Sequence, residues 1–337
     1  MERVIHVFST GKFERRSNTL YFETEAGEPR YLPVENVREI WIHGEVTFNK
    51  RFIEFLADRE ILLNIFNRYG YFVGTFYPRE HYNSGYMIVK QAEHYLDTKK
   101  RLQIARAFVS GAATNMLRVL KYYAGRGKDV TKSIASIEAL VDHVKSIDVE
   151  KGQTSISELM GLEGNIREQY YRAFDAIIQQ PAFSYLRRTR RPPSNALNAL
   201  ISFLNSIVYT TVLSEIYKTH LDPRIGYLHT TNFRRFTLNL DVAEIFKPIL
   251  ADRTIFRVLG RKMITAKDFE VNHGGVWLSE SARKQLVADF DAKLNTTVMH
   301  RPLKRAVSYR RLIRLELYKL EKHLMGEQEY TPFEAMW

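Results

Sequence analysis

Three carboxylates and one histidine stand at positions where they can hold a divalent metal ion. Glu163 borders the apolar stripe of a predicted helix, and a carboxylate that faces a core must be paired, protonated or bound to a metal. Asp241 and Glu244 are three residues apart, so a short helix presents both on one face. His229 follows a loop, residues 221–224, after a long apolar segment. Oxygen ligands with one nitrogen suit Mg²⁺ or Mn²⁺, which would support phosphodiester chemistry.

Each of these residues also has a simpler interpretation, which the sequence leaves open. Glu163 can form a salt bridge with Arg167, one turn later on the same helix. His229 can be a hydrogen-bonded histidine beside a turn. Asp241 can cap the start of its helix, where the helix dipole favours negative charge. Lys247, further along that helix, can neutralise an acid or contact a phosphate.

The charge of the chain indicates a polyanionic partner. Its 337 residues include 50 Lys and Arg against 38 Asp and Glu, a formal net charge of +12. Residues 1–85 hold 11 basic and 12 acidic residues, which leaves 39 basic and 26 acidic residues for 86–337. A surface that binds nucleic acid or an anionic membrane is therefore expected in the second part of the chain.

Two basic clusters favour nucleic acid. The first consists of four arginines before a Pro-Pro pair and has no acid nearby: Arg187, Arg188, Arg190 and Arg191. The second, residues 301–323, sets eight basic residues against two glutamates: Arg301, Lys304, Arg305, Arg310, Arg311, Arg314, Lys319 and Lys322. Arg310, Arg311 and Arg314 cover adjacent positions of one predicted helix and can follow a phosphate backbone. The alternative is a solvated helix face.

The composition narrows the class of protein and the kind of metal site. The chain has no cysteine, which excludes disulfides and thiolate zinc sites. It has no run of about 18 apolar residues and no signal-peptide pattern at its start, so we expect neither a membrane span nor export. These features fit a cytoplasmic protein.

The pattern of apolar residues predicts an α+β fold with a β-rich domain over residues 1–78. Short β-branched and aromatic runs alternate there with turn residues, and Leu62–Phe66 with Tyr71–Phe76 predicts a hairpin. One helix interrupts them, with Phe52, Phe55 and Leu56 on one face and Asn49 as its cap. We interpret residues 79–89 as a linker.

The pattern of apolar and basic residues over 90–337 predicts a larger, basic, all-α domain. A long helix through residues 102–120 ends near Gly125–Gly127. Further helices are expected over residues 134–147, 157–178, 197–217, 284–294 and 309–324. The helix over 197–217 is the most apolar, so we expect it to be the central buried helix. Tyr170 and Tyr171 are either core residues or stacking partners for an unpaired base.

The order and spacing of several motifs resemble the CRISPR-associated integrase family, the larger of the two adaptation proteins shared by most CRISPR systems. Around the candidate site the motifs are Leu162–Arg167, Asn198–Leu200, Leu228–His229, Leu238–Pro248 and Asp252–Arg253. Outside it they are Val7–Gly11, Gly70–Arg79 and Val276–Ser279, so the resemblance covers almost the whole chain. The sequence departs from the family at Gly111-Ala112-Ala113 and at Asn205, where relatives often have a basic residue and a tyrosine.

The resemblance implies a β-sandwich-like N-terminal domain that helps to form a homodimer, and a helical catalytic domain. It implies that Glu163, His229 and Glu244 hold Mg²⁺ or Mn²⁺. Asp241 and Arg167 would support the site, and Lys247 would contact DNA. The implied activity is that of a metal-dependent DNA endonuclease and integrase that inserts spacer DNA into CRISPR arrays. The implied partners are double-stranded DNA with single-stranded ends, CRISPR repeat DNA and the small second CRISPR adaptation protein.

Other functions remain open at this stage. A DNA-binding scaffold would keep the basic clusters and need no metal, so its activity would not respond to EDTA. A nuclease for branched or damaged DNA would use the same residues. A protein of anionic membranes is disfavoured, since no basic amphipathic helix has the exposed apolar face that it needs. The last residues, Tyr330 to Trp337, can dock either on the partner or on the body of the protein.

Overall fold

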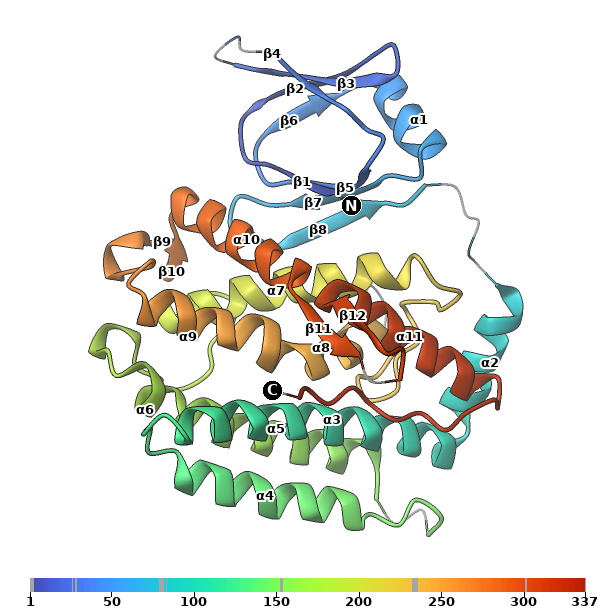
Figure 1. Ribbon diagram of the computed structural model, residues 1–337, viewed down its shortest axis with the longest axis vertical. Coiled ribbons are helices and arrows are strands. Elements are labelled where there is room, and N and C mark those ends of the chain that lie inside the picture. The colour runs from blue at the N-terminus through green and yellow to red at the C-terminus, as the bar shows by residue number, and fades with distance from the viewer. Residues whose placement is uncertain are drawn as a thin grey trace. The chain divides into compact units, whose positions relative to one another are not determined.

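The computed structural model describes residues 3–25, 27, 29–78, 82, 84–151, 154–231, 236–300 and 302–336. It divides into two compact units, Met1–His81 and Tyr82–Trp337 (Figure 1). The boundary falls inside the predicted linker over residues 79–89. Helix α2, Gly85–Leu96, begins within that stretch and is capped by Ser84, whose Oγ accepts a hydrogen bond from Met87 N at 3.3 Å. The prediction was therefore wrong for residues 85–89, which are helical.

The first unit consists of two four-stranded sheets and one helix. One sheet has the order β1-β5-β7-β8, with parallel pairs up to β7 and an antiparallel β8. The other has the order β4-β3-β2-β6. The elements are β1 Arg3–Val7, β2 Gly11–Arg16, β3 Thr19–Thr24, β4 Pro29–Leu32, β5 Val37–Ile42, β6 Val46–Phe48, α1 Lys50–Asp58, β7 Leu62–Phe66 and β8 Phe72–Phe76.

The apolar runs that alternate with turn residues in this unit supply its hydrophobic core. Phe13 of β2, Phe22 of β3 and Phe52 of α1 are buried together, with ring centroids 4.6 Å and 5.0 Å from that of Phe13. The predicted helix is confirmed, and Asn49 Oδ1 caps it by accepting a hydrogen bond from Phe52 N at 3.1 Å. The predicted hairpin is confirmed as β7 and β8.

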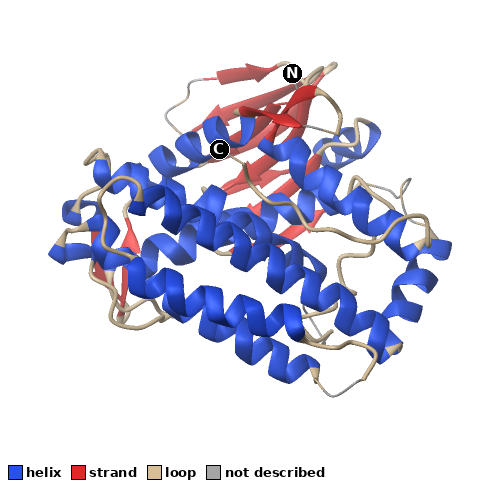
Figure 2. Ribbon diagram, turned by 60° about the horizontal axis from the view of Figure 1, so that its bottom comes forward, coloured by secondary structure: helices blue, strands red, loops and turns tan. Residues whose placement is uncertain are grey.

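The second unit is mostly helical, and Figure 2 shows its helices in blue. Its longer helices are α2, α3 Thr98–Ala124, α4 Thr131–Ser146, α5 Ile156–Arg172, α7 Ala196–Ile216, α8 Leu238–Lys247, α10 Glu280–Asn295 and α11 Tyr309–Leu324. The shorter ones are α6 Phe174–Ile178 and α9 Arg253–Gly260, and a π-helical turn, Pro248–Asp252, joins α8 to α9. A β-rich unit followed by a larger helical unit is the predicted α+β arrangement, which is confirmed.

Two details of the predicted helical domain were wrong. The helix expected over residues 157–178 is divided into α5 and α6, because Ala173 N donates to Tyr170 O, three residues back, and tightens the last turn. The domain is also not entirely α-helical. It contains two short hairpins, β9 Phe269–Asn272 with β10 Gly275–Leu278, and β11 Thr297–His300 with β12 Arg305–Ser308.

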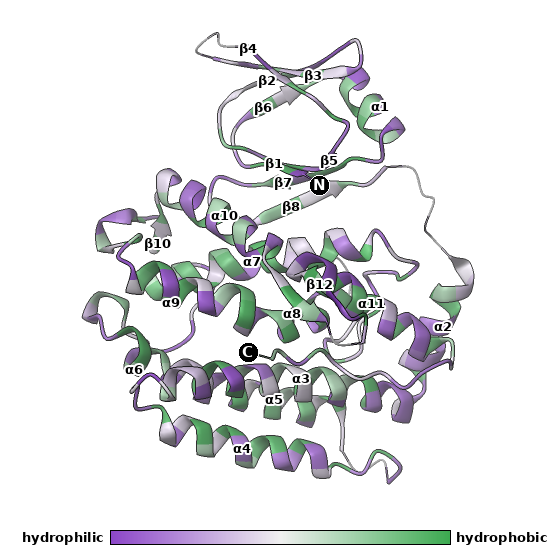
Figure 3. Cartoon of the chain, in the orientation of Figure 1, coloured by the Kyte–Doolittle hydropathy of each residue, from purple (hydrophilic) through white to green (hydrophobic). Residues whose placement is uncertain are grey.

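Helix α7 is the buried centre of the second unit, as predicted. It packs on α8, α11 and β10. Among the described residues it is the one helix long and apolar enough to cross a membrane by length and composition, and most of it is buried inside the protein. Helix α4 is amphipathic instead, and its ribbon alternates between green and purple in Figure 3. Helices α3, α5 and α8 position the candidate site.

Candidate metal centre

The loop that carries His229 follows α7 and is fixed by side chains from α2 and α3. Gln91, buried on α2, donates to Asp222 O at 3.1 Å and to Ile225 O at 3.3 Å, and its Oε1 accepts from Asp222 N at 2.7 Å. Arg101 of α3 donates to Tyr227 O at 2.9 Å. The backbone before His229 is thus held by groups more than 120 residues away in the chain.

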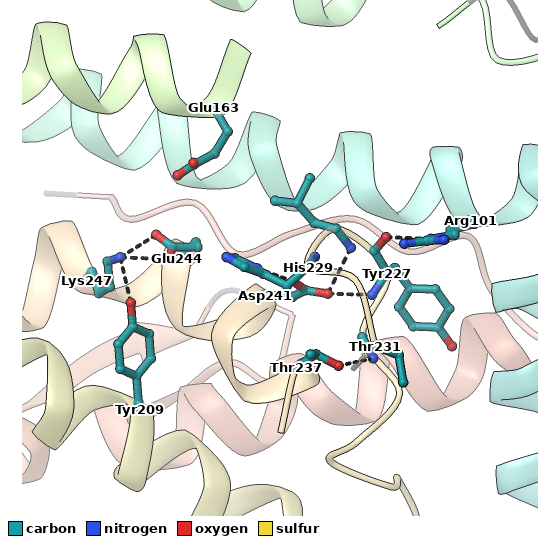
Figure 4. Close-up of polar contacts among 12 residues, drawn as sticks. Arg101, Glu163, Tyr209, Tyr227, His229, Thr231, Thr237, Asp241, Glu244 and Lys247 are labelled. Carbon is teal, nitrogen blue, oxygen red and sulfur yellow. Dashed lines mark hydrogen bonds and ion pairs between the residues drawn. The ribbon is translucent and has the colours of Figure 1, made fainter. Parts of the chain in front are cut away.

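Asp241 organises the end of this loop. Its fully buried carboxylate accepts hydrogen bonds from Tyr227 N at 2.6 Å and Leu228 N at 3.0 Å through Oδ2. Its Oδ1 accepts from His229 N at 2.9 Å and lies 2.7 Å from His229 Nδ1 (Figure 4). A carboxylate beside Nδ1 favours a proton there, and the neutral ring then has a lone pair on Nε2 for a ligand. The alternative that Asp241 caps its own helix is wrong, since its partners lie in the loop.

The close approach of loop and helix depends on Gly226. A Cβ at this position would lie 2.7 Å from Thr237 C and 2.8 Å from Asp241 Oδ2, closer than real Cβ contacts. The Gly226 N–H donates to Thr237 Oγ1 at 2.9 Å. Only a residue without a side chain lets this backbone come so near the carboxylate.

Glu163 and Glu244 come from two different helices and meet at one guanidinium. Arg167 donates to Glu163 Oε1 through Nε at 2.8 Å, and its Nη2 contacts Glu163 Oε1 and Glu244 Oε2. The salt bridge between Glu163 and Arg167 that the sequence offered is therefore present. Lys247 Nζ lies 2.7 Å from Glu244 Oε1 and 3.2 Å from the hydroxyl of Tyr209.

The electrostatics of the site follow from burial and these ion pairs. Burial would raise the pKa of the Glu244 carboxyl, but Arg167 and Lys247 outweigh burial and hold this pKa well below its usual value. Burial would lower the pKa of His229, but the hydrogen bond and charge of Asp241 outweigh it and raise this pKa. The charges of Glu244 and Glu163 act on the ring in the same direction. The Glu244 carboxylate is thus ionised and attracts cations.

The three predicted ligands extend toward a common space from α5, α8 and the loop before α8 (Figure 4). Two carboxylates and one imidazole nitrogen fit Mg²⁺ or Mn²⁺. Among the residues that the structure describes, however, no three Asp, Glu or His side chains stand close enough to hold a metal ion as they are. The cation between the two glutamates in this structure is the guanidinium of Arg167, since it contacts both. The donor chemistry fits the metal, and Arg167 lies where the ion would bind.

Side chains inside the second unit contact Arg188, Arg310 and Arg314, which were predicted to bind DNA. Arg188 donates to Asn198 Oδ1 at 3.0 Å, near the start of α7. Arg310 and Arg314 lie 3.5 Å and 2.6 Å from the carboxylate of Glu215, which is fully buried on α7. A structural role for these three is visible, and their contact with DNA stays a prediction.

The other predicted arginines are nearer the surface. Arg187, Arg190 and Arg191 are exposed. Arg311 is half-buried beside the ring of Tyr318, 5.6 Å from its centroid. Arg301 lies outside the described residues.

Several residues that shape the site were missed by the sequence reasoning. Gln91 was detectable in principle, because it is a polar residue in the buried stripe of α2 between Met87 and His94. Tyr209, which contacts Lys247, carries no such signal because it lies on an apolar helix. Tyr170, with an exposed fraction of 1%, belongs to the core with its neighbour Tyr171, so the base-stacking alternative is wrong.

Known proteins of one family are similar to this chain over most or all of its length. The family model described as CRISPR associated protein Cas1 matches residues 5–292. A relative from Thermodesulfovibrio yellowstonii, named CRISPR-associated endonuclease Cas1 2, is 54% identical over 337 residues, which is 100% of each chain. A solved structure of a CAS1 protein from Thermotoga maritima is similar with a TM-score of 0.85 at 46% identity, covering 98% of this chain and 100% of that one.

A more distant solved structure shares the fold alone. It is a casposase bound to an integration product, with a TM-score of 0.84 at 18% identity over 100% of this chain and 95% of that chain.

Proposed function

Because the chain belongs to the CRISPR associated protein Cas1 family, we propose that it is a metal-dependent DNA endonuclease and integrase that inserts spacer DNA into CRISPR arrays. One observation carries this proposal. Glu163, Glu244 and His229 extend from three elements toward one space. The Asp241 carboxylate binds Nδ1 of His229, so Nε2 points away from that carboxylate. The named activity of a relative 54% identical over its full length supports the reaction class.

Glu163, Glu244 and His229 Nε2 would hold one Mg²⁺ or Mn²⁺ ion. When bound, the ion would polarise a phosphodiester and lower the pKa of the attacking hydroxyl, whether of water or of a DNA 3′ end. Attack by water breaks the phosphodiester and leaves a phosphate end and a hydroxyl end. Attack by a DNA 3′-hydroxyl forms a new phosphodiester while the old P–O bond breaks and releases the hydroxyl end of the target strand. Arg167 must withdraw from the two carboxylates for the ion to bind, because two cations cannot occupy the same position.

The remaining residues of the site bind and orient. Asp241 keeps the ring proton of His229 on Nδ1, which fixes the ring and leaves Nε2 as the ligand atom. Lys247 is buried between Glu244 and Tyr209, where its charge stabilises the ionised Glu244. Its contact with a DNA phosphate stays a prediction. The exposed arginines at 187, 190 and 191 would contact the DNA backbone further from the site.

The proposed partners are a second copy of the chain, the small second CRISPR adaptation protein, DNA duplexes with single-stranded ends and CRISPR repeat DNA. The formal excess of positive charge in residues 86–337 supports a DNA partner for the helical unit. The homodimer and the second adaptation protein rest on membership of the family.

The test is strand transfer of a labelled spacer-like duplex into a plasmid with a CRISPR repeat, in the presence of the small partner. Joined product is expected with Mn²⁺ and is expected to disappear with EDTA. Glu163→Ala and His229→Ala should each abolish cutting and joining while DNA affinity stays within about threefold, since neither side chain is part of the basic clusters.

Two outcomes would redirect the proposal. Normal integration by both variants would show that the site is elsewhere, and DNA binding without any metal-dependent reaction would favour a scaffold. Cutting of branched DNA with no preference for a repeat would favour a repair nuclease.

A further inference from the structure

The last described residues of the chain, 330–336, form an extended C-terminal segment that lies along α3. Figure 1 shows it in dark red beside that helix. Tyr330 is anchored to α11, because its hydroxyl donates to the buried carboxylate of Glu316 at 2.6 Å. The same Glu316 Oε1 accepts from Phe333 N at 2.9 Å. The segment is thus docked on the body of the protein, one of the two possibilities that the sequence left open.

One buried residue of α3 joins this segment to the helix of the candidate site. Asn115, fully buried, donates from Nδ2 to Phe333 O at 3.0 Å and accepts at Oδ1 from Ala335 N at 2.8 Å. Its Nδ2 also donates to Ile245 O at 2.9 Å. Ile245 directly follows Glu244 on α8. All three hydrogen bonds of the amide therefore connect α3, α8 and the C-terminal segment.

A second contact reaches α8 at the next residue. The ring of Phe333 stacks on that of Phe246, with centroids 5.5 Å apart and planes inclined by 7°. Glu244 and Lys247 are three residues apart on one face of α8, so Ile245 and Phe246 lie behind that face. The C-terminal segment thus supports α8 from the side opposite the candidate metal ligand.

The departure from the family at residue 111 has an explanation here. A Cβ on Gly111 would lie 2.5 Å from Pro332 Cβ, so a larger residue on α3 would push the C-terminal segment away. Glycine at this position therefore leaves room for the C-terminal segment.

We propose that the C-terminal segment, acting through Asn115 and Phe333, is a positioning element that sets the affinity of the site for a divalent ion by fixing α8. The metal part of this inference rests on the proposed function. Groups that orient a metal ligand without touching the ion typically change metal affinity by about 10- to 100-fold when removed. Asn115 bonds to the backbone of Ile245 and Phe333 stacks on Phe246, so both act through the backbone and packing of α8.

The experiment uses full-length variants and two measurements, Mn²⁺ affinity by calorimetry and hydrogen exchange of the α8 amides. Phe333→Ala and Asn115→Ala should weaken Mn²⁺ binding about tenfold or more, with the Kd for DNA unchanged within about twofold, and should speed exchange in α8. Phe333→Tyr should keep the affinity, because its ring still covers Phe246.

Glu334→Ala is the matched control. This residue lies in the same segment, but its carboxylate pairs with Arg118 of α3 at 2.6 Å and is 46% exposed. It should leave both measurements unchanged. An equal loss of Mn²⁺ affinity in Glu334→Ala and Phe333→Ala would overturn the inference, because the effect would then be general loosening. Unchanged Mn²⁺ affinity in Phe333→Ala would overturn it as well.

The exchange measurement separates this inference from the proposed function. If the wild-type protein bound no Mn²⁺, the proposed metal site would fail, and the positioning claim would be decided by exchange alone. Faster exchange of α8 in Phe333→Ala but not in Glu334→Ala would then support it, and equal exchange in both would overturn it.

Discussion

Replacing Asp241 by asparagine would test the network that holds His229. The carboxylate accepts four hydrogen bonds, two at each oxygen, from Tyr227 N, Leu228 N, His229 N and His229 Nδ1. An asparagine side chain has one oxygen and one NH₂ group, so two of these donors lose their acceptor. If the NH₂ group of the asparagine points toward Leu228, the buried N–H groups of Tyr227 and Leu228 face a donor instead of an acceptor.

The opposite orientation costs less and has a chemical consequence. With the NH₂ group toward His229, the ring can move its proton to Nε2 and accept at Nδ1, so only one backbone N–H is orphaned. An orphaned buried N–H costs about 1–3 kcal/mol, and the remaining bonds lose the strengthening from charge. We therefore expect Asp241→Asn to lower the free energy of unfolding by roughly 2–4 kcal/mol. The proton on Nε2 would also block the ligand atom.

The assay compares urea unfolding with Mn²⁺-dependent DNA cutting in Asp241→Asn and His229→Ala. Asp241→Asn should lower cutting by about 10- to 100-fold, as is typical when the partner of a metal-ligating histidine is disturbed. His229→Ala should abolish cutting, because it removes a proposed ligand. His229→Ala should cost only about 1 kcal/mol of stability, because it leaves Asp241 bonded to three backbone N–H groups and the ring is partly exposed. Wild-type stability together with wild-type cutting in Asp241→Asn would show that the Asp241 carboxylate does not hold His229 for metal binding.

Three further predictions concern packing and pH. Gly226→Ala should destabilise the protein by about 1–3 kcal/mol in urea unfolding, because its Cβ meets backbone, whereas Gly164→Ala, in open space, should not. Burial raises the pKa of Asp252 to about 7, so the folded state holds a proton that the unfolded state has lost between about pH 4 and 7. The free energy of unfolding should therefore decrease over that range, by up to about 4 kcal/mol at pH 8. Asp252→Asn should abolish this decrease. Burial, with help from nearby arginines, lowers the pKa of Lys293 to about 8, so stability should rise between about pH 8 and 10.5. Because solvent screens this partly exposed amine, the rise should amount to roughly 1–2 kcal/mol, and Lys293→Met should abolish it. A rise of equal size in the variant would show that Lys293 is not its cause.

The part of the site that sequence could predict is the part set by local spacing. The i, i+3 pair Asp241 and Glu244 and the i, i+4 pair Glu163 and Arg167 lie on single helices, whose period fixes which side chains share a face. The same period placed α7 and α11 within one residue of their bounds, and Gly125 marked the end of α3, whose start lies four residues before the predicted stripe. Local patterns were sufficient for these features.

The part that could not be predicted depends on contacts distant in sequence. Asp241 was a possible helix cap, yet its carboxylate bonds to the loop 12 to 14 residues earlier. Asn115 meets Ile245 and Phe333, 130 and 218 residues away. No local pattern marks such an amide, because its partners are backbone groups that any residue carries. The two hairpins of the helical unit were missed for a related reason, since strands of four residues are too short to show a clear period.

A manganese anomalous difference map from crystals grown with Mn²⁺ would show whether Glu163, Glu244 and His229 bind the ion. We expect one peak within about 2.0–2.3 Å of oxygen atoms of Glu163 and Glu244 and of His229 Nε2, with Arg167 displaced from the two carboxylates. A map with no peak there, and with Arg167 still between the glutamates, would contradict the assignment of these residues as the metal site.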